Sequence, residues 1–135
     1  GAVGSVQEAF DRYLRTGGPA AVEKVKLTPS DAIAAIRAAR GVAVLAHPYQ
    51  LNVGDGDTLD EAVRRLVGDG LQGIECRYSS HTPEQSARCR ELARGYHLVE
   101  TGGSDYHGRL RPDAPLGGTR VPLRFFHDLC RRAHS

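Results

Sequence analysis

An aspartate and a histidine two positions apart, Asp105 and His107, lie in the glycine-rich segment 102–108 (Gly-Gly-Ser-Asp-Tyr-His-Gly). In extended backbone, side chains at positions i and i+2 point to the same face, so this carboxylate and this imidazole are expected to lie together. Such a pair can bind one divalent metal ion or share two. The flanking glycines allow the backbone to approach an ion or a phosphate closely. The alternative is a turn-capping Asp beside a surface His.

Two more candidate ligands follow short apolar runs elsewhere in the chain. His47 comes directly after the run 42–46, and Glu75 lies near the end of the run 71–76. If these runs are neighbouring parallel strands, both side chains reach the same edge as Asp105. Two histidines and two carboxylates suit Zn, Mn or Fe. Equally, His47 could bond to a backbone carbonyl, and Glu75 could be an exposed or salt-bridged carboxylate.

Several residues near these candidates suit a phosphate group. His81 precedes an expected helix, whose free N–H groups and positive dipole end attract anions. Arginine binds phosphate oxygens through two N–H groups at once, and Arg77, Arg109 and Arg111 are available for this role. The alternatives are a surface loop histidine and solvated surface charges.

Composition limits the possible classes of protein. A chain of 135 residues with 40% hydrophobic and 25% charged residues is ordinary for one globular domain. Its net charge of +2 is too small to indicate nucleic acid or an anionic membrane as a partner. No apolar run has the length of a membrane span, and no signal peptide is visible. Three cysteines without a C-x-x-C pair favour free thiols in a reducing cytoplasm. Position 1 is Gly, so we expect a chain processed, tagged or cut from a longer one.

Helices and short strands alternate in the predicted secondary structure. Capping boxes begin helices at Ser5, Thr28, Thr58 and Thr82, and a fifth helix is expected over 122–133. The strands are 42–46, 71–76 and 98–101, and a polar glycine-rich loop is expected over 50–57. Alternating helices and apolar strands indicate an α/β fold of parallel βα units. Three strands make a thin sheet, which suggests a piece of a larger barrel.

Three of these segments resemble motifs of one family. Residues 44–48 (Val-Leu-Ala-His-Pro), 70–75 (Gly-Leu-Gln-Gly-Ile-Glu) and 101–108 (Thr-Gly-Gly-Ser-Asp-Tyr-His-Gly) resemble the PHP (polymerase and histidinol phosphatase) family, in particular its TrpH-like branch. The resemblance implies a distorted (β/α)7 barrel with metal ions at the carboxyl ends of the strands. It also implies hydrolysis of phosphate esters, on short nucleic-acid 5′ ends or nucleoside 3′,5′-bisphosphates.

The resemblance implies roles for five candidate residues. His47, Asp105 and His107 match metal-ligand positions for Mn, Zn or Fe, while Glu75 and His81 match positions close to the site and are predicted to be catalytic. The chemistry of arginine predicts that Arg77 and Arg109 bind phosphate.

The sequence departs from the family pattern in one respect. The family also has a His-x-His motif, a bridging Glu and a further His upstream, whereas no His precedes His47. We therefore expect residues 1–135 to be a single domain that forms the C-terminal portion of a PHP domain, with little activity alone. Its expected partners are a small phosphorylated substrate, the missing N-terminal half and, through open strand edges, other copies of itself. The alternatives are a non-catalytic PHP-derived interaction or structural module, and an α/β domain that binds an anion.

Overall fold

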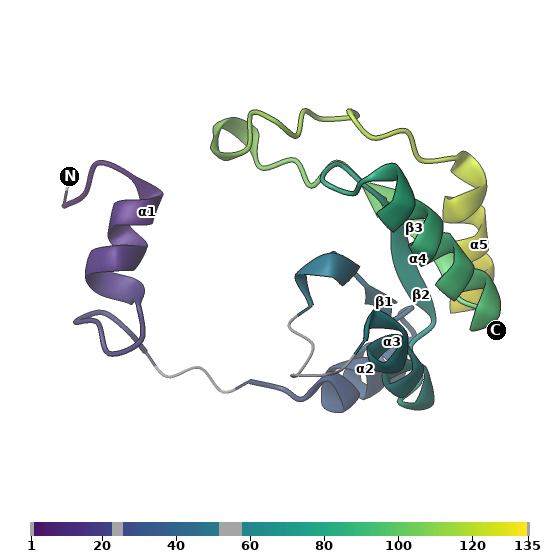
Figure 1. Cartoon of the computed structure of the whole chain (residues 1–135). Helices are drawn as coiled ribbons and strands as arrows, with labels where there is room; N and C mark the ends of the chain where they lie inside the picture. The colour runs from purple at the N-terminus through teal and green to yellow at the C-terminus, as the bar shows by residue number, and fades with distance from the viewer. Residues whose placement is uncertain (1, 23–25, 52–57, 135) are drawn as a thin grey trace.

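The computed structural model describes residues 2–22, 26–51 and 58–134, and these contain a three-stranded parallel sheet in the order β1-β2-β3. The strands are Val44–Leu45, Gly73–Tyr78 and Val99–Gly103. The helices around them are α2 (Pro29–Ala38), α3 (Leu59–Gly68), α4 (Pro83–Gly95) and α5 (Leu123–Ala133). The predicted α/β class and the order of elements are confirmed (Figure 1). Apart from its first two residues, the loop predicted over 50–57 lies outside the described residues.

All four predicted helix starts are found at the expected residues. The hydroxyl oxygens of Ser5, Thr28, Thr58 and Thr82 each accept a hydrogen bond from the backbone N–H three residues later. At Thr58 and Thr82, the third residue also accepts a bond from the backbone N–H of the cap, which completes the capping box. Local sequence therefore sets where these helices begin.

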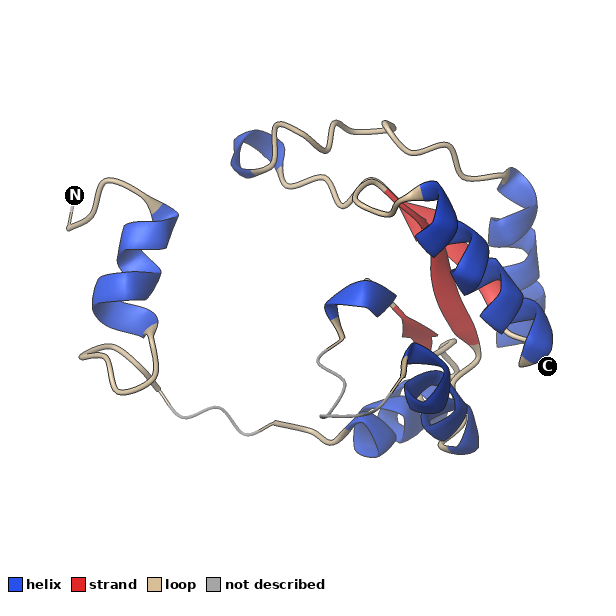
Figure 2. Ribbon diagram, in the orientation of Figure 1, coloured by secondary structure: helices blue, strands red, loops and turns tan. Residues whose placement is uncertain are grey.

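One apolar cluster joins the sheet to α2, α3 and α4. It consists of Ile33, Ala43, Val63, Leu71, Ile74, Cys76, Cys89, Leu92, Ala93 and Leu98. The helix α4 packs on β2 and β3, and α5 packs on β3, where Phe125 is buried (Figure 2). The helix α4 therefore buries one face of β2, and polar side chains lie on the other face.

The N-terminal helix lies apart from the sheet in Figure 1. It comprises α1 (Val6–Ala9) and the π-helical segment η1 (Phe10–Leu14). Its apolar side chains, including Phe10, are about half exposed. Among the described residues, no helix has the length and apolar character needed to cross a membrane.

A β-bulge in β2 decides which side chains face the polar side of the sheet. Glu75 pairs with Thr101, but the next pair is Arg77 with Gly102, so Cys76 is an extra residue in the strand. Because a bulge shifts the alternation of side chains by one position, Glu75 and Tyr78 share a face and Arg77 does not. Gly102 permits this register, since a Cβ there would lie 2.5 Å from the carbonyl oxygen of Arg77.

Candidate functional site

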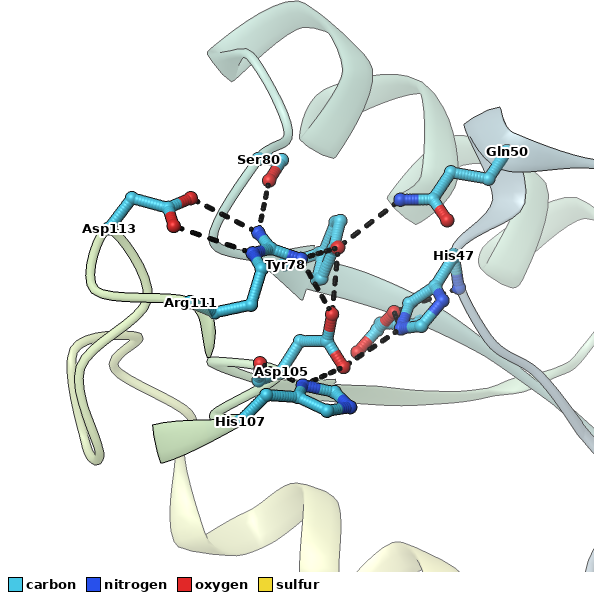
Figure 3. Close-up of polar contacts among 9 residues, drawn as sticks. His47, Gln50, Tyr78, Ser80, Asp105, His107, Arg111 and Asp113 are labelled. Carbon is cyan, nitrogen blue, oxygen red and sulfur yellow. Dashed lines mark hydrogen bonds and ion pairs between the residues drawn. The ribbon is translucent and has the colours of Figure 1, made fainter. Parts of the chain in front are cut away.

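Polar side chains gather at the carboxyl ends of all three strands, as the parallel arrangement predicts (Figure 3). His47 follows β1, Glu75 lies in β2, and Asp105 follows β3. His47 and Asp105 both have left-handed backbone, with φ of 45° and 54°. L-residues seldom adopt this conformation, and residues held in it are concentrated at functional sites. Three elements distant in sequence therefore converge on one edge of the sheet.

Asp105 is the centre of this group. Its Oδ1 lies 3.6 Å from His47 Nε2 and 3.4 Å from His107 Nδ1. Its Oδ2 accepts hydrogen bonds from the Tyr78 hydroxyl at 3.1 Å and from Arg111 at 3.0 Å. The two oxygens thus have different surroundings, because one faces two imidazoles and the other is held by two donors.

The predicted reason for the proximity of Asp105 and His107 is wrong, although the proximity itself is found. Strand β3 ends at Gly103, so the two residues are not in extended backbone. Instead, the left-handed turn at Asp105 folds the chain back, and His107 Nδ1 lies 2.7 Å from the carbonyl oxygen of Asp105. The His107 side chain remains 57% exposed, so its other ring nitrogen is accessible.

Glu75 is buried and bound to the neighbouring strand end. Its Oε2 accepts a hydrogen bond from the backbone N–H of His47 at 2.9 Å and lies 4.0 Å from His47 Nε2. The left-handed backbone of His47 places both its N–H and its ring near this carboxylate. Glu75 therefore orients His47 toward Asp105.

His81 lies in an aromatic wall beside these groups. Its ring makes edge contacts with Tyr49 and Tyr78, with centroids 5.4 and 5.2 Å apart, and Tyr78 also lies 4.7 Å from the His47 ring. Both His81 ring nitrogens are buried and have no hydrogen-bond partner in the described protein. Burial lowers the pKa of His81, although the negative charge of Glu75 opposes this, so the neutral imidazole is favoured.

The structure does not bring Arg77 and Arg109, the two predicted phosphate-binding residues, to Asp105 and the histidines. Because of the bulge, Arg77 faces α5, where its guanidinium lies 5.9 Å over the Phe125 ring. It also donates to the carbonyl oxygen of Arg120, in the segment before α5. Arg109 is exposed and makes no hydrogen bond or ion pair with any described residue. Arg111 is the arginine of the three that contacts Asp105.

Tyr78 is the site residue that sequence reasoning missed. Its hydroxyl accepts from Gln50 and donates to Asp105. Regular alternation along β2 would place Glu75 and Tyr78 on opposite faces of the sheet. Only the bulge brings Tyr78 to the face of Glu75, so the sequence pattern does not identify Tyr78 as a site residue.

The donor types at this edge suit a divalent metal ion, but their arrangement is incomplete. An open hollow of about 370 Å³ lies at this edge and is lined by His47, Asp105, His107, Leu110 and Arg111. Within ranges 2–22, 26–51 and 58–134, no group of three or more His, Cys, Asp or Glu side chains is arranged to hold a metal ion. Imidazole and carboxylate groups are nonetheless ligands that Zn, Mn and Fe accept. These residues therefore fit part of a coordination shell.

The chain is similar in sequence to several proteins that are named as phosphodiesterases, phosphatases or exoribonucleases. It is 48% identical over 92 residues to the phosphoribosyl 1,2-cyclic phosphate 1,2-diphosphodiesterase of Eggerthella lenta, covering 68% of this chain and 32% of that protein. It is 34% identical over 123 residues to the 3′,5′-nucleoside bisphosphate phosphatase of Chromobacterium violaceum, covering 88% and 41%. A 5′-3′ exoribonuclease of Escherichia coli is 32% identical over 114 residues, covering 79% and 36%. No family model matches the sequence.

A solved structure shares the fold. A protein from Bifidobacterium adolescentis that is named as a metal-dependent phosphoesterase superposes with a TM-score of 0.73 and 28% sequence identity, over 93% of this chain and 44% of that one. The predicted resemblance is confirmed: the chain is a homologue of PHP-type phosphoesterases, and its sheet corresponds to part of their barrel. It spans 32 to 41% of the length of these curated relatives.

Proposed function

We propose that this chain is part of a metal-dependent phosphoesterase in which His47, Asp105 and His107 bind a divalent ion of Mn, Zn or Fe. The observation that carries the proposal is the position of Asp105 Oδ1, which lies within 4 Å of a nitrogen of both histidines at the carboxyl edge of the sheet. This edge is where α/β folds bind their ligands. The name of the Bifidobacterium protein, which describes it as metal-dependent, supports the same assignment.

The residues around this group have separable tasks in the proposed reaction. A divalent metal at a phosphoester stabilises charge on the phosphoryl oxygen and lowers the pKa of bound water. Glu75 orients His47 by accepting its backbone N–H. His81, held neutral by burial, can exchange a hydrogen bond or a proton with the phosphate or the leaving group. The rings of Tyr49 and Tyr78 shield His81 from water.

The proposed substrates are small phosphate esters of nucleotides. The named relatives act on a cyclic ribose phosphate, a nucleoside bisphosphate and RNA, which share a phosphoester on a ribose. We therefore propose a nucleoside 3′,5′-bisphosphate or the 5′ end of a short oligonucleotide as the substrate. The remaining metal ligands are proposed to lie in the part of such proteins that this chain does not cover, and little turnover is expected from the chain alone.

Metal binding is the direct test of the proposal. The purified chain is titrated with Mn²⁺ or Zn²⁺ in competition with a chromophoric chelator, alongside Asp105→Asn and His107→Ala. His127→Ala is the matched control, because His127 is exposed on α5. We expect both site variants to lose binding and the control to keep it. The metal assignment is refuted if the wild-type chain binds no metal, or if the site variants bind as tightly as the control.

Hydrolysis is measured separately with two substrates. Release of inorganic phosphate from a nucleoside 3′,5′-bisphosphate reports phosphatase activity, and release of mononucleotides from a 5′-phosphorylated oligonucleotide reports exonuclease activity. We expect weak activity that a chelator and Asp105→Asn abolish. Activity that survives both changes would contradict a metal-dependent mechanism. Metal binding without any hydrolysis, even in a longer chain that supplies the remaining ligands, would favour the non-catalytic module.

A further inference from the structure

Arg111 is hydrogen-bonded more extensively than any other described side chain at this edge. Its Nη1 donates to Asp105 Oδ2 at 3.0 Å and to the Tyr78 hydroxyl at 3.5 Å (Figure 3). Its Nη2 donates to Asp113 Oδ2 at 3.2 Å and to Ser80 Oγ at 3.4 Å, and its Nε donates to Asp113 Oδ1 at 3.4 Å. A guanidinium has five N–H donors, so these five bonds engage all of them.

Two carboxylates surround the Arg111 charge from opposite sides. Asp113 receives two of the bonds and is largely exposed, whereas Asp105 receives one and is largely buried. The Arg111 side chain is itself 30% exposed. Because Asp113 balances the positive charge, Arg111 can bond to Asp105 without fully cancelling the negative charge that Asp105 presents to the histidines.

The same bonds connect two separate segments of the chain. Tyr78 and Ser80 belong to β2 and the turn that follows it, while Asp105, Arg111 and Asp113 belong to the segment after β3. Arg111 therefore fixes the segment 105–113 to the end of β2. In doing so it also fixes the rotation of the Asp105 carboxylate, because Oδ2 is bound and Oδ1 is not.

We propose that Arg111 is a positioning residue that holds Asp105 so that Oδ1 alone faces His47 and His107. This inference rests on the proposed function, in which Asp105 binds the metal. Groups that hydrogen-bond a metal-binding carboxylate orient it, and their loss weakens metal binding by about 10- to 100-fold. Asp105 accordingly offers one oxygen to the metal, and Arg111 does not bind the phosphate, since its donors are already engaged.

The experiment compares Arg111→Met with Arg109→Met, which removes the same charge from the same segment at a residue whose side chain has no partner in the described part of the chain. Arg111→Lys tests whether charge alone suffices. Metal affinity is measured by chelator competition with Mn²⁺ or Zn²⁺, and hydrogen exchange of the amides in 105–113 is measured by mass spectrometry. Thermal unfolding of each variant shows whether the whole fold is retained.

We expect Arg111→Met to bind metal about 10- to 100-fold more weakly and to exchange the 105–113 amides several-fold faster, while Arg109→Met matches the wild type in both. Arg111→Lys should recover part of the affinity, because one ammonium can replace the bond to Oδ2 but not the fork to Asp113. Tighter metal binding by Arg111→Met would show that Arg111 competes with the metal for Asp105, which overturns the proposal.

Failure of the proposed function is distinguishable from failure of this inference. A wild-type chain that binds no metal refutes the metal assignment, and hydrogen exchange then decides the role of Arg111 alone. Equal exchange in Arg111→Met and Arg109→Met overturns the positioning role, whatever the wild type binds. The positioning role is also overturned if the wild type binds metal and Arg111→Met binds it with the same affinity.

Discussion

Gly102→Ala should destabilise the protein, whereas the same change at its neighbour, Gly103→Ala, should not. Both glycines lie in β3. A Cβ at position 102 would lie 2.5 Å from the carbonyl oxygen and 2.7 Å from the Cβ of Arg77, both closer than real Cβ contacts. A Cβ at position 103 meets nothing within 4 Å. The pair therefore separates the close approach at the bulge from the general effect of replacing glycine in a strand.

The magnitude follows from which atoms must move. The obstructing atoms at Gly102 belong to the backbone and Cβ of β2, so relief requires the two strands to separate or twist. Overpacking of this kind costs about 1–3 kcal/mol. Both variants gain about 0.4–1 kcal/mol from the reduced freedom of the unfolded chain, and this gain cancels in their comparison. Gly102→Ala should thus be about 1–3 kcal/mol less stable than Gly103→Ala.

Thermal and urea unfolding of the two variants and the wild type measure this difference. For a chain of 135 residues, 1 kcal/mol shifts the melting temperature by roughly 3–5 °C. Gly102→Ala should melt below the wild type, and Gly103→Ala should melt at or slightly above it. Equal melting temperatures for the two variants would refute the bulge register at Cys76, and with it the reason that Tyr78 faces Asp105.

Three other expectations follow from the buried residues. Burial lowers the pKa of His81 from its ordinary value of 6.5, so as the pH falls the unfolded chain binds a proton at His81 before the folded chain does. The free energy of unfolding should therefore decrease as the pH drops below about 6.5. In urea unfolding, His81→Gln should remove that part of the pH dependence. Ile74 is fully buried, so Ile74→Ala should cost about 2–5 kcal/mol and Ile74→Val about 0.5–1.5 kcal/mol in the same assay, and equal costs would contradict the packing described. Burial raises the pKa of Cys76 to about 12 and of Cys89 to about 11. A thiol reagent should therefore label Cys130 quickly in the native protein, and the other two cysteines only after denaturation. Rapid labelling of all three cysteines in the native protein would argue against this core.

Much of the fold could be predicted from local sequence. Four helix starts have a hydroxyl residue that accepts a bond from the backbone N–H three positions later, and such a contact depends only on neighbouring residues. The apolar runs before His47 and Asp105 likewise place both residues at strand ends, although β1 is shorter than the run 42–46 that predicted it. The convergence of His47, Glu75 and Asp105 followed from the parallel arrangement.

What the sequence did not determine depends on contacts between distant segments. Regular alternation gives no sign that Cys76 is an extra residue, because a bulge is fixed by the pairing partner, here Gly102. For that reason the sequence does not reveal that Tyr78, rather than Arg77, lies on the face of Asp105. Arg109 and Arg111 are equivalent in local sequence, and only the position of the β2 end decides which one reaches Asp105. Propensity, capping and apolar runs are local, so the sequence predicts which elements form and which edge of the sheet carries the polar residues. Strand register and contacts between long side chains are set across the sheet, so the side chains that meet at this edge depend on the tertiary fold.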